Sequence, residues 1–200
     1  MDFKNPFSSG DWPDRFGSVA DDAQLADLFG FDDTLGLRVG RRKVFNKRRT
    51  ARVDFFVSTI WLLYIHPTFS KSAVLGVAVA ESLESGPAAP PCWIKAIFAA
   101  NGAFTARKID ADPLPSMVTN IPLLLPLEGQ GRDGIFYRLR MQAAVNSVID
   151  FDNPGTGPLW PIEQCCWTLA ESVARQAGEQ ALLDYVAEWR RYIGPTAKSQ

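Results

Sequence analysis

Cysteine and histidine are both scarce in this chain. Cys92, Cys165 and Cys166 are the three cysteines, and His66 is the one histidine. Adjacent cysteines do not easily bridge to each other, and three cysteines are a poor count for the disulfide framework of a small secreted domain. One histidine excludes a histidine-rich metal site, and the cysteines lack the paired spacing of structural zinc sites. These absences predict a cytoplasmic protein with no metal or cofactor site.

Long apolar runs are also missing. The longest, Phe55 to Ile65, has eleven residues, and Ser58 and Thr59 interrupt it. A spanning helix needs about 20 apolar residues. The first residues, Met1 to Pro6, lack the basic and then apolar pattern of a signal peptide. We therefore expect no membrane partner.

Short catalytic motifs are equally rare. The chain has no G-x-S-x-G, G-x-x-x-x-G-K-[ST] or H-E-x-x-H pattern. A Cys92–His66 nucleophile pair has no local support. The pairs Asp110/Asp112 and Asp150/Asp152 resemble Mg²⁺ ligands, but they lie beside prolines, where aspartates commonly form turns. We assign no catalytic residue.

Charge is abundant and unevenly arranged. The formal net charge is −1, from 21 Lys+Arg and 22 Asp+Glu. Residues 1–33 nevertheless hold eight acids and two bases, residues 34–52 hold eight bases and no acid, and residues 53–200 carry a net −3. The near-zero total is therefore a sum of opposed blocks.

The basic block predicts binding to phosphate. Eight cations in so short a segment repel one another unless anions lie nearby. Arginine offers a fork that matches phosphate oxygens, and lysine a point charge. Because no helix-turn-helix, zinc-finger or RNA-recognition signature accompanies the segment, we expect contacts to the nucleic-acid backbone. The predicted binding residues are Arg38, Arg41, Arg42, Lys43, Lys47, Arg48, Arg49 and Arg52. Among the interleaved apolar residues, Phe45 either seats the segment on the core or stacks on an unpaired base.

The acidic arm, residues 1–33, supports other interpretations of the same charges. It could fold onto the cations within one molecule or across a dimer. It could also engage a protein partner, as in an inhibitor or assembly factor, with Trp12 as an anchor.

A glycine motif supports a third hypothesis, a nucleotide-binding enzyme. Residues 129–134 read Gly-Gln-Gly-Arg-Asp-Gly and match G-x-G-x-x-G, which cradles a pyrophosphate at a helix N-terminus. However, Pro122 and Pro126 are unsuitable for a central parallel strand. Asp133 also sits where it could simply cap a following helix. A glycine turn before a capped helix accounts for the motif equally well.

Periodicity and turn signals predict the secondary structure. A buried strand is favoured over Val53–Ile65 by its aromatic and β-branched residues, and edge strands or loop are expected at 103–128 because of four prolines. Short helices are predicted over Asp21–Phe29, from Ser70 or Ser72 to about Leu83, and over Cys92–Ala100. Longer ones are predicted over Gly134–Ile149 and from Pro161 to Ile193, the last divided at Gly178.

These elements predict an α+β fold. It is a helix-rich single domain with a small sheet around Val53–Ile65 and a C-terminal helical layer. Residues 1–33 form an acidic N-terminal arm with a short helix, and residues 34–200 form the globular domain. The favoured function is that of a non-enzymatic, cytoplasmic regulatory protein. It would engage nucleic acid or a nucleoprotein complex through the basic segment 38–52.

Overall fold

One long strand organises the molecule. The computed structural model describes residues 20–31, 36–45, 52–68, 70–83, 92–114, 134–152 and 159–193, with the backbone alone at 42–45, 52–54 and 92. Within these ranges β2 spans Arg52–Pro67, which confirms the strand predicted over Val53–Ile65. β-Branched and aromatic side chains suit a pleated surface that is buried on both faces.

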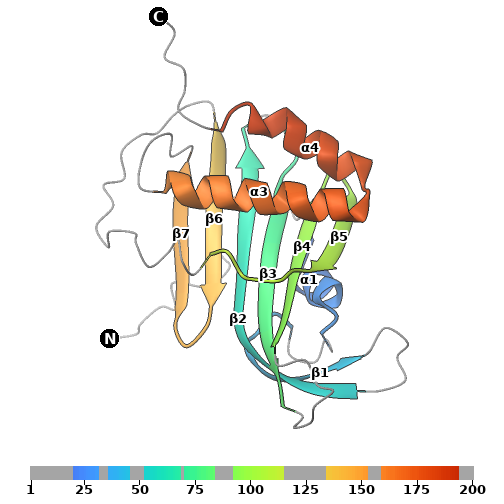
Figure 1. Ribbon diagram of the computed structural model, residues 1–200. Helices are drawn as coiled ribbons and strands as arrows, with labels where there is room; N and C mark the ends of the chain where they lie inside the picture. Colours follow the sequence, from blue (N-terminus) through green and yellow to red (C-terminus); the bar gives the residue numbers. More distant parts are fainter. Residues whose placement is uncertain are drawn as a thin grey trace, which may run out of the picture.

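Six further strands pair with β2 or with one another, and every pairing is antiparallel. The order is β5-β4-β3-β2-β6-β7, while β1 pairs with the first part of β2 on the same edge as β6. Figure 1 shows β1 and the start of β2 curving away from the main sheet. The bounds are β1 Gly40–Phe45, β3 Ala73–Ser82, β4 Cys92–Ala100, β5 Ala103–Lys108, β6 Ile135–Gln142 and β7 Asn146–Asp152.

The prediction of a helix-rich fold with a small sheet is therefore wrong. Segments predicted as helices form β3, β4 and the β6–β7 hairpin instead. The central strands β3 and β4 are buried on both faces, so their sequences are continuously apolar and do not alternate. In β6 the alternation of Tyr137, Leu139 and Met141 with arginines was the correct signal. Alanine and valine content misled the prediction, because tertiary packing overrides intrinsic propensity.

The predicted helices at both ends are confirmed. α1 spans Asp22–Phe29, where Asp21 and Gln24 form a capping box and Gly30 ends the helix with a positive φ. α3 spans Trp160–Ala177 and α4 spans Gln180–Arg190, divided at Gly178 with φ 67° as the sequence predicted. No helix in the described ranges is long and apolar enough to cross a membrane.

The sheet is covered on both faces. α3 and α4 cross one face and α1 packs on the other (Figure 1). Under α3 and α4 the core includes Trp61, Phe98, Tyr137, Trp167 and Tyr185. Under α1 it is smaller and includes Leu25, Phe29, Phe55, Leu62 and Ile97.

Gly76 in β3 allows close packing in the core beneath α1. A Cβ at this position would lie 2.6 Å from Cδ2 of Leu62 and 3.2 Å from both Cγ1 of Ile97 and the carbonyl oxygen of Trp61. Gly76→Ala is expected to lower the free energy of unfolding by about 1–3 kcal/mol, because the added methyl group would overpack the core beneath α1. Urea denaturation measures the loss.

The same substitution made in a Leu62→Ala background provides the control. Removing the Leu62 methyls relieves the nearest clash, so we expect Gly76→Ala to cost less there. An equal loss in both backgrounds contradicts this account of Gly76.

Candidate nucleic-acid interface

The basic segment forms a two-stranded antiparallel ribbon. β1 pairs with the start of β2, with Gly40 opposite Val57, Lys43 opposite Asp54 and Phe45 opposite Arg52. Of the eight predicted binding residues, Arg41, Arg42, Lys43 and Arg52 lie on these two strands, and Arg38 immediately precedes β1. The other three, Lys47, Arg48 and Arg49, lie outside the described residues.

A β-bulge bends the ribbon away from the main sheet. The register of β2 against β3 shifts between Val57 and Thr59, so Ser58 is an extra residue in β2. Its hydroxyl lies 3.4 Å from the carbonyl oxygen of Val79. A bulge bends the strand and increases its twist, which fits the curvature of β2 in Figure 1.

The base of the ribbon is fixed on its α1 side by aromatic packing. Phe55 and Val57 are buried in the core beneath α1. The ring centroids of Phe55 and Trp93 are 6.1 Å apart, and Phe31 lies at the same distance from Trp93. Leu37 is buried in the same core just before β1. These contacts attach the base of the ribbon to the core beneath α1.

Three exposed side chains are described on or next to the ribbon, those of Arg38, Arg41 and Phe56. Arg38 lies between the buried Leu37 and the half-buried Val39, and Arg41 is the second residue of β1, opposite Phe56. Phe56 is 45% exposed, although its neighbours in β2 are buried. Glu81 on β3 is also exposed and lies directly opposite Phe56. Sequence reasoning overlooked Phe56, yet the alternation of a strand places it on the face opposite Phe55.

The hypothetical Cys92–His66 pair is not brought together. His66 lies at the end of β2 and its Nδ1 is 2.8 Å from the Ser72 hydroxyl. Cys92 instead pairs with Glu81 at the other end of β3. Ala73, opposite the end of β2 near His66, and Glu81 are eight residue steps apart along β3, which at about 3.3 Å per step separates the two levels by about 26 Å.

The two D-x-D pairs do not form a metal site. Asp150 lies on β7 and accepts two hydrogen bonds from Arg138, at 2.8 and 2.9 Å. Asp112 accepts from Trp61 Nε1 at 3.0 Å and from the backbone N–H of Leu114 at 3.1 Å. Within the described ranges, no three His, Cys, Asp or Glu side chains gather to hold a metal ion.

The glycine motif lacks the setting that a dinucleotide requires. Residues 129–133 lie outside the described residues, so the predicted cap at Asp133 is not described. Gly134 is followed by strand β6, where the motif requires a helix. The acidic residues 1–19, with Trp12, also lie outside the described residues.

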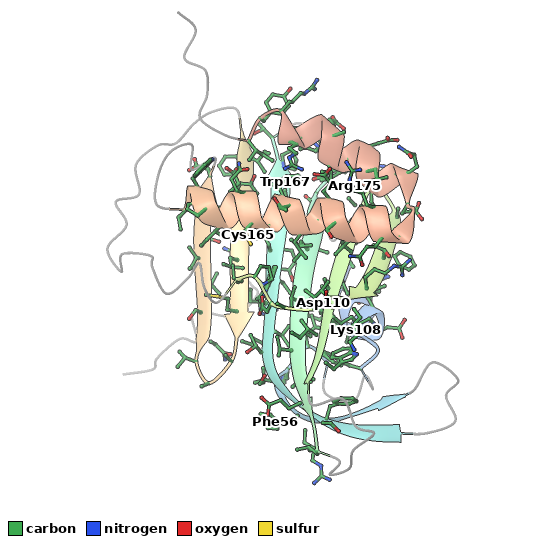
Figure 2. The ribbon with its side chains drawn as sticks, in the orientation of Figure 1. Phe56, Lys108, Asp110, Cys165, Trp167 and Arg175 are labelled. Atoms are coloured by element: carbon green, nitrogen blue, oxygen red, sulfur yellow. The ribbon has the colours of Figure 1, made fainter. Side chains whose placement is uncertain are left out.

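The surface between α3 and α4 is charged, and its charges pair with one another. Arg175, labelled in Figure 2, forms an ion pair with Glu171 at 2.6 Å, and Arg190 pairs with the same carboxylate. Gln180 donates a hydrogen bond to Asp184 at 2.7 Å. We therefore assign no ligand to this surface.

A buried carboxyl lies between the sheet and α3. Glu163 is 1% exposed, and its Oε1 accepts a 2.7 Å hydrogen bond from the Tyr137 hydroxyl. That hydroxyl in turn accepts from Trp167 Nε1 at 3.0 Å. Burial raises the pKa of Glu163 to about 7, and the Tyr137 hydrogen bond opposes this rise. The helical stripe of Trp167, Ala170 and Ala174 includes Glu163, so its spacing was the signal that sequence reasoning overlooked.

The two cysteines of α3 differ in burial. Cys166 is buried, whereas Cys165 is half-buried. Burial raises the pKa of the Cys166 thiol well above its usual range. Neither thiol is therefore activated as a nucleophile.

No family model, curated protein or solved structure matches this chain.

Glu163 makes stability depend on pH. Between the ordinary carboxyl pKa of 4.5 and about 7, the folded chain keeps a proton that the unfolded chain has lost. The free energy of unfolding therefore falls as pH rises through this window and stays low above it. Glu163→Gln is expected to be more stable than the native chain by about 3 kcal/mol at pH 8, and by about 1 kcal/mol at pH 5. Urea denaturation at both pH values measures this difference.

Glu188 provides the matched control, because it is an exposed glutamate on the neighbouring helix. Glu188→Gln should change stability by a similar small amount at both pH values. An equal effect of Glu163→Gln at pH 5 and pH 8 contradicts the raised pKa.

Proposed function

We propose that this chain is a non-enzymatic, cytoplasmic regulatory protein that binds nucleic acid, alone or within a nucleoprotein complex, through the β1–β2 ribbon. The observation that carries the proposal is the placement of the cations. Arg41, Arg42, Lys43 and Arg52 lie on two adjacent antiparallel strands, and Arg38 leads into them. A two-stranded ribbon is narrow enough to enter the major groove, and it can also follow a phosphate backbone.

The local charge balance supports phosphate as the ligand. The paired residues 40–45 and 52–57 include one acid, Asp54, which lies opposite Lys43, and four cations. Contact with phosphates relieves the repulsion among the cations and releases counterions from the nucleic acid. Backbone contacts of this kind position a protein without specifying sequence.

An acidic protein partner would use the same cations, so the test must separate the two ligands. The arginine fork pairs with carboxylates as well as with phosphates. What distinguishes nucleic acid is the regular array of phosphates along its strand, which a carboxylate-rich peptide does not carry. Poly-glutamate of matched charge is therefore the competitor. Tighter binding to poly-glutamate than to oligonucleotides would favour the protein-partner function over the one proposed.

Neutralising Arg41 on β1 and Arg38 just before it, the two predicted arginines whose side chains are described, tests the interface. We expect Arg38→Gln/Arg41→Gln to reduce oligonucleotide affinity about 10-fold or more at 50 mM salt, and to reduce the slope of log K against log salt by about 2. Fluorescence anisotropy across a salt series measures both quantities.

Lys71→Gln/Arg191→Gln is the matched control. It removes the same amount of positive charge from two exposed positions. Lys71 lies just before β3, at the end of the sheet away from the ribbon. Its salt slope should equal that of the native chain. Absence of binding by the native chain at 50 mM salt, or equal losses in both double variants, rejects the ribbon as the interface.

Glu81 is expected to weaken binding. It is exposed on β3, directly opposite Phe56 of the ribbon strand β2. Its carboxylate would therefore repel phosphates bound to the ribbon. Glu81→Gln should raise affinity by roughly twofold at 50 mM salt, and the gain should vanish at high salt because exposed charges are screened. A fall in affinity would place the bound phosphates elsewhere.

A further inference from the structure

Phe56 is an exposed aromatic ring on the ribbon. Its side chain is 45% exposed, whereas Phe55 and Val57 on either side are buried beneath α1. The alternation of β2 therefore points Phe56 to the face opposite α1. Figure 2 shows Phe56 at the end of the sheet farthest from α3 and α4. The helices that cover this face elsewhere leave the ring accessible.

Charges of opposite sign flank this ring across the strands. Arg41 on β1 and Glu81 on β3 are its two partners in the ladders, and both are exposed. Residues directly opposite each other have Cβ atoms about 4.5–5.5 Å apart and lie on the same face. The row therefore places a cation, an aromatic ring and an acid side by side.

This arrangement suits a nucleotide whose base is unpaired. A base stacked on the Phe56 ring would direct its phosphate toward Arg41 and away from Glu81. Stacking on an aromatic side chain needs an open base face, which a single strand offers and an intact duplex does not. Any of the bases has such a face, so the contact tolerates any sequence.

We infer that Phe56 stacks on an unpaired base and makes the ribbon selective for single-stranded nucleic acid. The inference rests on the proposed function, because the ribbon cations supply the phosphate contacts. Arg41 acts on single strands and duplexes alike, whereas Phe56 acts on strands with accessible bases.

The experiment compares three ligands of equal length: a single strand, its duplex, and a strand of abasic sites that keeps the phosphates. Phe56→Ala should weaken binding to the single strand about 10-fold, while its affinities for the duplex and the abasic strand stay unchanged. Phe56→Trp should retain single-strand affinity, and Phe56→Leu, which is apolar without a ring, should resemble Phe56→Ala.

One control variant and the pattern of losses separate this inference from the proposed function. Phe104→Ala removes a ring that is 64% exposed on β5 and should leave all three affinities unchanged. Equal losses by Phe56→Ala on all three ligands, or no loss on any, overturn the stacking role while leaving the ribbon as the interface. Absence of binding by the native chain to every ligand overturns both. Thermal unfolding of each variant checks that it is folded.

Discussion

β2 is hydrogen-bonded along both of its edges, and the rest of the structure depends on how those edges are shared. One edge pairs with β3 along nearly the whole strand. The other is divided between β1, whose first residue Gly40 lies opposite Val57, and β6, whose last residue Gln142 lies opposite Ile60. The bulge at Ser58 falls at this division. A single strand therefore belongs to both the ribbon and the helix-covered sheet, and its bulge lies where the ribbon bends away.

Polar side chains buried beneath α3 fix how the helix lies on the sheet. Tyr137 links β6 to Glu163 and Trp167 of α3, while Asp112 fixes the chain after β5 to Trp61 of β2. Directional bonds of this kind specify one arrangement of the layers, whereas apolar contacts alone tolerate several. The helix-covered face is thus the rigid part of the molecule, and the ribbon lies at the other end of the same strands.

Local signals predicted the elements whose ends are marked by caps or turns. Asp21 and Gly30 delimit α1, and Gly178 divides α3 from α4. The sheet was underestimated, because β3 and β4 are buried on both faces and read as apolar runs that suit either a helix or a strand. The basic segment was recognised from charge alone. Its ribbon geometry comes from the pairing of β1 with the next strand, β2, which the charge pattern does not specify. The exposure of Phe56 depends on which face of β2 the more distant elements cover.

The division of the β2 edge also separates two levels of local stability. Among the described strands β1 is hydrogen-bonded to β2 along one edge. In contrast, β2 and β3 are each hydrogen-bonded to neighbouring strands along both edges. The cations of the ribbon lie on β1 and the start of β2, on one side of the bulge. Opening of β1 therefore needs less free energy than global unfolding. An anion that holds these cations together would protect the β1 amides from hydrogen exchange before it changed the stability of the core.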